Sequence, residues 1–304
     1  MIKLASRTLL NLALLIVFGI LVLFVVFKPG TSVPEAIKVS ALAKTDVRSI
    51  LLQREGVENI QLEKQDGKWM MTAPFRYLAN DFKVDSLLQL INTASNAQYD
   101  VATLDLSKYG LDKPRAVVTI NGDQQFIFGT TEPLQHQRYL RYQNTLHVIT
   151  DTFYYQIAAA ATGFLNHVVI PGSTNITKIV VPTLTAELTE GKWTVTPAPK
   201  ELAADQITAF IDAWRFAQAL QVTAYKGKPI PPTIKIYRQG DTQPLEFGAF
   251  QRGNDYVLVR NDLQLQFVLA ADKRKDLLEL PPKIEPENSK AASSPAVDPI
   301  NNIE

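Results

Sequence analysis

The 304-residue sequence contains no cysteine, which excludes disulfides, thiolate metal ligands and cysteine nucleophiles. It also lacks an excess of either charge, because 31 Lys and Arg residues stand against 30 Asp and Glu residues. Nucleic acid is therefore not an expected partner, since DNA and RNA binding requires clustered positive charge. The hydrophobic content of 46% is that of a globular protein and not of a disordered chain.

The motifs of common enzyme and cofactor sites are absent as well. The sequence has no Walker loop, no dinucleotide-binding glycine pattern, no Gly-x-Ser-x-Gly elbow and no His-Glu-x-x-His. The three histidines, His136, His147 and His167, lack the spacing of zinc ligands. We therefore expect no cofactor, no metal ion and no catalytic residue, and an enzyme is the less favoured class.

One long apolar run stands near the N-terminus, from Thr8 to Phe27, and it carries no charge. A helix of this length spans about 30 Å, the hydrocarbon thickness of a bilayer. Lys3 and Arg7 precede it, so the positive-inside rule places the N-terminus in the cytoplasm and the body in the periplasm. A cleavable signal peptide and a buried core helix fit less well, because the run is long and apolar all round. The sequence predicts a single-pass protein of the bacterial inner membrane, in contact with lipid through residues 8–27.

The rest of the chain contains an internal repeat. Asp66-Gly67-Lys68-Trp69 with Pro74 recurs as Glu190-Gly191-Lys192-Trp193 with Pro197, an offset of 124 residues from Trp69 to Trp193. Further matched segments, in the same order, are Leu78–Asp81 with Leu202–Asp205, Phe126–Gly129 with Leu245–Gly248, and Leu146–Val148 with Leu265–Phe267.

Each copy has the pattern of an antiparallel sheet with a helix on one face, which makes the predicted fold class α+β. In the first copy we expect strands at Asn59–Lys64, Lys68–Thr72, Ala116–Ile120, Gln125–Phe128, Arg138–Tyr142 and Leu146–Ile149. Helices are expected over Asp81–Ala97 and Thr152–Ala161. The second copy repeats the main helix with Ile207, Phe210, Ile211 and Trp214 at helical spacing.

The last hairpin of the first copy is expected to turn around Asn144. That register pairs Leu140 with Val148 on the core side and places His147, opposite Arg141, on the solvent side.

The predicted organisation has five segments. They are a cytoplasmic stub and anchor (1–30), a juxtamembrane linker (31–45), a first α+β repeat (46–165), a second α+β repeat (166–280) and a disordered tail rich in Pro, Ser and Ala (281–304).

Trp69, Pro74, Asp81 and the segment Tyr109-Gly110-Leu111-Asp112-Lys113-Pro114 together resemble the bacterial domain-of-unknown-function family 4340. The resemblance covers roughly residues 52–280, although Tyr225-Lys226-Gly227-Lys228-Pro229 replaces the Tyr-Gly-Leu-x-x-Pro element in the second copy. The resemblance implies an extracytoplasmic protein with one membrane segment, and an association of some members with ABC-type export systems. It implies no activity and no catalytic residue.

Tyr109, Gly110 and Leu111 are the candidate partner-binding residues. Their alternative role is a turn that sets the entry of the next strand, with Gly110 at a positive φ.

Four further positions have an ordinary structural role to weigh against a functional one. Asp81 and Asp205 are predicted helix N-caps rather than ligands. Trp69 and Trp193 are predicted core residues rather than stacking platforms for a ligand.

Three functions remain open. The favoured one is an envelope binding or accessory module whose partner is another envelope or membrane protein. The alternatives are an envelope hydrolase or transferase that uses carboxylates in a cleft between the copies, and a carrier of hydrophobic ligands. Carboxylate pairs such as Asp100 and Asp105 occur in the sequence, but such pairs are recognised only in three dimensions.

Overall fold

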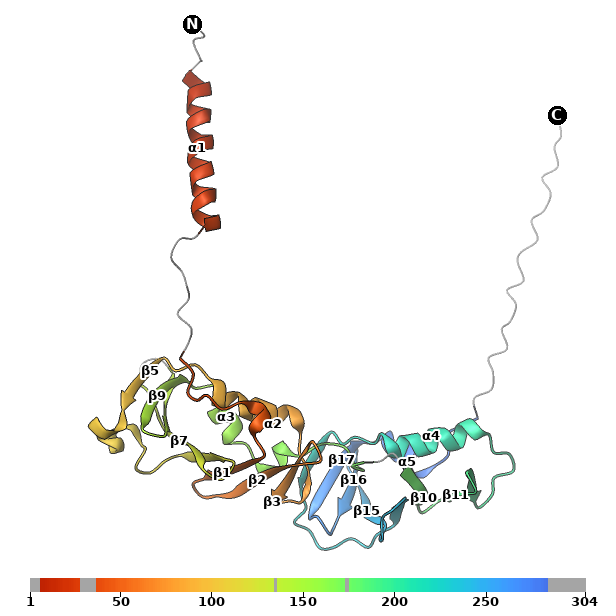
Figure 1. The fold of residues 1–304 in the computed structure, drawn as a ribbon. Helices are drawn as coiled ribbons and strands as arrows, with labels where there is room; N and C mark the ends of the chain where they lie inside the picture. Colours follow the sequence, from red (N-terminus) through yellow and green to blue (C-terminus); the bar gives the residue numbers. More distant parts are fainter. Residues whose placement is uncertain (1–5, 28–36, 134–135, 173–174, 284–304) are drawn as a thin grey trace, which may run out of the picture. The chain divides into compact units, whose positions relative to one another are not determined.

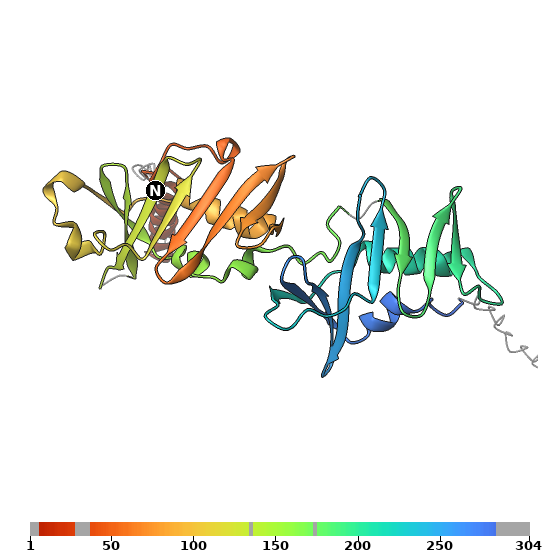
Figure 2. The same ribbon diagram turned by 90° about the horizontal axis from the view of Figure 1, so that it is seen from below.

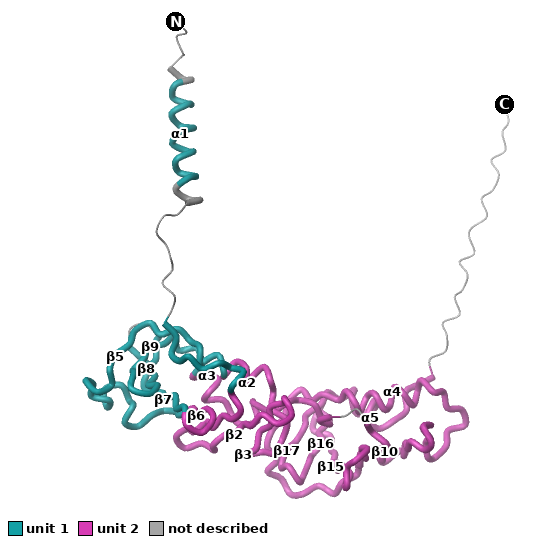
Figure 3. Tube along the Cα trace, in the orientation of Figure 1, with its two compact units in different colours: residues 1–46, 88–117, 124–153 teal, residues 47–87, 118–123, 154–304 magenta. Residues whose placement is uncertain are grey.

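The computed structural model describes residues 6–27, 37–133, 136–172 and 175–283 (Figure 1). These residues fall into two compact units (Figure 3). Unit 1 is made of residues 1–46, 88–117 and 124–153, and unit 2 is made of residues 47–87, 118–123 and 154–304.

The N-terminal helix α1 covers Ser6–Phe27. Its described side chains are those of residues 9–23, and all of them are exposed. Among the helices of the described segments, none is both long enough and apolar enough to cross a membrane.

The body is α+β, as predicted, with two antiparallel sheets. The first has nine strands in the order β4-β3-β2-β1-β6-β7-β8-β9-β5, and the second has eight in the order β12-β11-β10-β14-β15-β16-β17-β13. The first sheet comprises β1 (Ser49–Arg54), β2 (Val57–Gln65), β3 (Lys68–Ala73), β4 (Tyr77–Leu78), β5 (Ala97–Asp100), β6 (Ala116–Ile120), β7 (Gln124–Thr131), β8 (Gln137–Tyr142) and β9 (Thr145–Thr150). The second comprises β10 (Ile176–Val180), β11 (Thr185–Thr189), β12 (Lys192–Thr196), β13 (Gln221–Ala224), β14 (Ile234–Arg238), β15 (Leu245–Arg252), β16 (Asp255–Arg260) and β17 (Leu265–Ala270).

The two sheets have the same topology once the two-residue strand β4 is set aside. The turn before each tryptophan strand also matches, because Asp66 and Glu190 both have positive φ, of 49° and 51°. The prolines of the repeat agree too: the peptide bonds Ala73-Pro74 and Thr196-Pro197 are both cis. The internal repeat seen in the sequence is therefore a repeat of structure.

One helix packs on each sheet (Figure 2). Helix α4 (Ala204–Arg215) buries the four apolar residues predicted for it, and the indole N–H of Trp214 donates to the carbonyl oxygen of Leu277 at 2.9 Å. Helix α2 covers only Asp81–Leu88 and continues as the 3-10 helix η2 (Gln89–Asn92).

The first helix is shorter than predicted because the chain becomes extended at Thr93, with φ −64° and ψ 148°. Thr and Ser residues compete with helical hydrogen bonds through their side chains, which favours such an end. Ala97, the last residue assigned to this helix from the sequence, instead begins strand β5 (Ala97–Asp100). In this helical stretch Phe82 is 75% exposed, whereas Val84, Leu87, Leu88 and Ile91 are buried.

The remaining elements are short. They are η1 (Lys44–Asp46), η3 (Val101–Thr103), η4 (Leu106–Tyr109), α3 (Tyr154–Ile157), η5 (Ala161–Phe164) and α5 (Lys273–Leu278). The helix predicted over residues 152–161 is thus reduced to one turn at α3, followed by η5. Most of the predicted tail, residues 284–304, lies outside the described residues.

The predicted register of the last hairpin in the first copy is wrong by one residue. Strands β8 and β9 pair Leu140 with His147 and Tyr142 with Thr145, so the turn contains only Gln143 and Asn144. Gln143, the first residue of this two-residue turn, has a φ of 52°, a left-handed conformation. Because side chains alternate across a strand, this slip moves His147 from the predicted solvent side to the side of Leu140.

Candidate functional site

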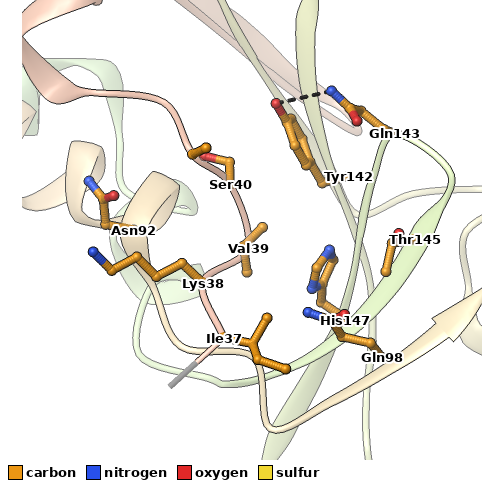
Figure 4. A pocket seen from close by; sticks show the side chains of 11 residues that line it. Ile37, Lys38, Val39, Ser40, Asn92, Gln98, Tyr142, Gln143, Thr145 and His147 are labelled. Atoms are coloured by element: carbon orange, nitrogen blue, oxygen red, sulfur yellow. Dashed lines mark hydrogen bonds between the residues drawn. The ribbon is translucent and has the colours of Figure 1, made fainter. Parts of the chain in front are cut away.

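A spacious pocket of unit 1 lies beside its sheet, and we call it the entry pocket (Figure 4). Its volume is about 800 Å³. One wall is the chain segment of residues 37–41, which we call the entry segment; the other residues come from η2, β5 and the β8–β9 hairpin. The pocket is lined by Ile37, Lys38, Val39, Ser40, Ala41, Asn92, Gln98, Tyr142, Gln143, Thr145 and His147.

The entry segment is held by hydrogen bonds to the stretch that follows α2. The Val39 N–H donates to the carbonyl oxygen of Thr93 at 3.0 Å, and the Ser95 N–H donates to that of Ile37 at 2.8 Å. The Ser40 hydroxyl donates to the Ile91 carbonyl at 2.7 Å, and Ser40 is buried. Part of the stretch predicted as a linker is therefore packed against unit 1.

His147 lies across the pocket from Val39 (Figure 4) and is only 3% exposed. Its Nδ1 atom lies 3.0 Å from the Ser95 hydroxyl oxygen. Burial lowers the pKa of His147 from its ordinary value of 6.5, because removal from water disfavours the charged imidazolium. The imidazole is thus neutral at pH 7.

Tyr142 forms the pocket wall next to the turn. Its hydroxyl donates to the Gln124 side-chain oxygen at 2.7 Å and accepts from the Gln143 amide at 3.3 Å. Its ring stacks on Phe126, with centroids 4.7 Å apart and 18° between the planes. The stacked ring and two hydrogen bonds give this wall a defined position before any ligand binds.

The predicted partner-binding residues Tyr109, Gly110 and Leu111 are not among those that line this pocket. Gly110 ends η4 with φ 65° and ψ 30°, a left-handed conformation, which agrees with its role in a turn. Leu111 is buried beside Leu146, and the ring of Tyr109 packs edge-on against Tyr139 with centroids 4.9 Å apart.

This segment approaches β7 very closely at Gly129. A Cβ atom added to Gly129 would lie 2.1 Å from the Tyr109 carbonyl oxygen, so only glycine fits there. Tyr109 is half-buried, whereas Leu111 is buried and Gly110 has no side chain. Of the three residues, only Tyr109 therefore has a side chain that a partner could contact. Binding of a partner there stays a prediction.

The caps predicted for the two main helices are shifted along the chain. The Asn80 side chain, and not Asp81, accepts the Lys83 N–H, at 3.3 Å. In α4 the N-cap position is Ala203, and the Asp205 carboxylate accepts the Gln206 N–H at 3.0 Å within the first turn.

The carboxylates Asp100 and Asp105 each begin a 3-10 helix. Asp100 accepts from the Ala102 N–H at 3.0 Å and from the Asn144 amide at 2.8 Å. Asp105 accepts from the Ser107 hydroxyl at 2.7 Å, and this bond is the main cause that lowers its pKa. Both have local structural partners.

The two repeat tryptophans differ in burial. Trp69 is a core residue, as predicted, with 4% exposure, whereas Trp193 is only half-buried. His136 is exposed and His167 is half-buried. The described residues contain no group of three or more His, Cys, Asp or Glu residues that could hold a metal ion.

Sequence reasoning missed the pocket because its lining comes from four separate segments. The one available signal was the Gln143-Asn144 pair, which as a two-residue turn places His147 on the side of Leu140. Nothing in the sequence pattern links residues 37–41 to that strand.

The two sheets and the pocket define a tandem α+β protein with a pocket lined largely by polar residues in its first copy. A family model described as "Domain of unknown function (DUF4340)" matches residues 69–229, more than half of the chain. This protein therefore belongs to that family, as the sequence resemblance predicted. Comparison with curated proteins and with solved structures gave no match.

Proposed function

We propose that this protein is a membrane-anchored binding module of the bacterial cell envelope and that the entry pocket is its binding site. The observation that carries the proposal is the pocket itself, whose volume of about 800 Å³ falls in the range of small-molecule sites. Its wall begins at Ile37, ten residues after the end of α1 at Phe27. Binding there would be close in sequence to the proposed anchor.

The anchor is supported by the uncharged run of residues 8–27. Helix α1 exposes large apolar side chains on all sides, an arrangement that water does not favour. The exposed large residues of this helix are Leu9, Leu10, Leu12, Leu14, Leu15, Ile16, Val17, Phe18, Ile20, Leu21, Val22 and Leu23. Lys3 and Arg7 favour a cytoplasmic N-terminus and hence a periplasmic body.

We expect the partner to be another envelope or membrane protein. The family resemblance adds a component of an ABC-type export system as the first partner to look for. The half-buried Tyr109 is a second contact point in this proposal, separate from the pocket.

The enzyme alternative has no specific observation in its favour. The carboxylates Asp100 and Asp105 cap short helices, and the described residues that line the entry pocket include no carboxylate. General acid–base catalysis by a carboxylate would need such a group within reach of the substrate.

Topology is tested first. Alkaline phosphatase fused behind Glu304 should be active, and the same fusion with GFP should be dark, if the body is periplasmic. The chain should sediment with membranes and resist extraction by alkaline carbonate. A soluble chain, or a fluorescent GFP fusion, would refute the anchored part of the proposal.

Binding is tested by photo-crosslinking in intact cells. A benzophenone amino acid replaces the pocket residue Thr145 in one variant and the exposed Lys113 of the same unit in the control. We expect specific adducts at position 145 that are absent at position 113. Equal labelling at both positions, or none at 145, would contradict a binding role for the pocket.

A further inference from the structure

The hydrogen bonds around Ser95 determine the tautomer of His147. The Ser95 hydroxyl donates its single proton to the Ala97 carbonyl oxygen at 2.9 Å. It can therefore only accept at its 3.0 Å contact with His147 Nδ1, so Nδ1 carries the proton. In a neutral imidazole this leaves Nε2 as a bare acceptor.

That acceptor is available to a ligand. Within the described parts of the chain, the only hydrogen bond of the His147 side chain is the one from Nδ1. Nε2 is not among the fully buried side-chain atoms that have no hydrogen-bond partner. It is therefore accessible at the surface of the pocket that His147 lines. A buried acceptor gains most from a partner that brings its own proton.

The other pocket side chains are almost all uncharged. Asn92, Gln98 and Gln143 carry amides that both donate and accept, and Thr145 adds a hydroxyl. Among the described lining residues the one charged side chain is Lys38, which is exposed at the rim. A cationic ligand would find no carboxylate among these residues, and an anionic one would face the lone pair of Nε2.

From this arrangement we propose that the entry pocket binds a neutral, hydroxyl-rich ligand of the carbohydrate class, one hydroxyl of which donates to His147 Nε2. Ser95 is the positioning residue that fixes the imidazole. The proposal rests on the proposed function, in that the pocket is the binding site, and it adds the chemistry of the ligand. Hydroxyl groups suit this lining because each of them can donate and accept at once, as the amides do.

The second copy carries an amide where the first carries the imidazole. There Gln266 pairs with Val259 across the hairpin, as His147 pairs with Leu140. The Gln266 amide donates to the Thr223 hydroxyl at 2.8 Å, and Thr223 is the residue paired with it in the neighbouring strand. In the first copy the corresponding neighbour of His147 is Gln98, and both of these side chains line the entry pocket.

The first experiment measures the tautomer directly. In the full-length chain in detergent micelles, labelled with ¹⁵N-histidine, His147 should show a protonated Nδ1 and a bare Nε2 at pH 7. Ser95→Ala should leave the fold intact and mix the two tautomers, whereas a merely structural role for Ser95 would not change their ratio. A protonated Nε2 in the wild-type chain would overturn the proposal.

The second experiment titrates the same sample with four probes: maltose, glucuronate, glucosamine and tetra-alanine. We expect maltose to move the Nε2 resonance, and His147→Gln to weaken binding roughly tenfold, the effect of one lost hydrogen bond. His136→Ala is the matched control, because this histidine is exposed and lies outside the pocket lining.

The outcomes separate the two proposals. Saturable binding of the charged sugars or of the peptide at equal or greater affinity would overturn the carbohydrate class, and so would failure of maltose to shift His147. If position 145 nevertheless crosslinks specifically in cells, the binding function stands with another ligand. If neither measurement detects binding, both proposals fail.

Discussion

The sheet ends of the two copies share one topology but differ in what they bury. In the first copy β8 and β9 contribute Arg138, 6% exposed, and His147, 3% exposed. The Arg138 guanidinium makes a two-pronged ion pair with Asp151, with distances of 2.9 and 2.8 Å. At the same places in the aligned second copy stand Val257, Gln266 and Ala270.

The comparison shows whether the sheet topology requires the buried polar side chains of the first copy. Val257 is completely buried, so the second sheet closes without a buried cation at this position. A buried ion pair is often no more stabilising than well-packed apolar residues of similar volume. The topology therefore does not require the buried polar groups of the first copy. His147, which lines the entry pocket, is thus free to serve another role there.

The largest expected difference between the copies concerns the tryptophans. Trp69→Ala removes a side chain that is 4% exposed and should lower the free energy of unfolding by about 4 kcal/mol. Trp193→Ala removes a half-buried one and should cost about 2 kcal/mol. Urea unfolding followed by circular dichroism measures both; equal losses would show that the two copies depend on this position alike.

The buried ion pair gives the next effect. Asp151→Ala leaves the Arg138 charge in the protein without its carboxylate and should cost about 3 kcal/mol. Adding Arg138→Val places at this position the apolar residue of the second copy, Val257, and should recover most of that loss. A double variant as unstable as Asp151→Ala would mean that the first sheet, unlike the second, does need these charges.

The two copies are also expected to differ at a matched pair of glycines, Gly129 in β7 and Gly248 in β15. Gly129→Ala places a methyl group 2.1 Å from a backbone oxygen, that of Tyr109, and should cost about 3 kcal/mol or prevent docking of the segment that contains Tyr109. Gly248→Ala meets the side chain of Ile230 at 2.7 Å and should cost about 1 kcal/mol. Thermal unfolding of the two variants gives the order, and the reverse order would contradict it.

The smallest effect is a dependence on pH. Burial lowers the pKa of His147 in the folded chain below its ordinary value of 6.5. At a pH below 6.5 the unfolded chain therefore binds a proton at this histidine more readily than the folded chain does. The contribution of His147 to stability is therefore complete above pH 6.5 and is lost as the pH falls towards its pKa in the folded state. His147→Gln, which copies the second repeat, should remove this part of the acid sensitivity. The measurement is the urea midpoint of both proteins as a function of pH. Parallel profiles for the wild-type chain and the variant would argue against a contribution of His147 to the acid sensitivity.

Much of this architecture could be predicted because it depends on local patterns. The Asp66-Gly67 and Glu190-Gly191 turns, the apolar spacing of α4 and the order of the strands all leave a signal within a few residues. Strand β1, which lies inside the first sheet between β2 and β6, and the edge strands β4 and β5 were not predicted. Strand β4 has only two residues, and β5 is exposed over three of its four, so neither shows a clear alternation.

The site could not be predicted in the same way. A turn at Gln143-Asn144 and a turn centred on Asn144 both pair apolar residues, and only the positive φ of Gln143 separates them in the structure. That single-residue difference decides whether His147 faces water or the pocket. The contact of the entry segment with Thr93 and Ser95 is a tertiary one and leaves no trace in hydrophobic periodicity.

The attachment of the entry segment has a mechanical consequence. Any pull exerted on the body from the N-terminal side must pass through Ile37 and Val39, whose two backbone hydrogen bonds are the first that hold the segment. Such a load would break these two hydrogen bonds one after the other, before it could shear the strands of the sheet. Among the described residues of unit 1, the wall of the pocket is therefore the first part that we expect to yield to such a load, while the sheet stays intact.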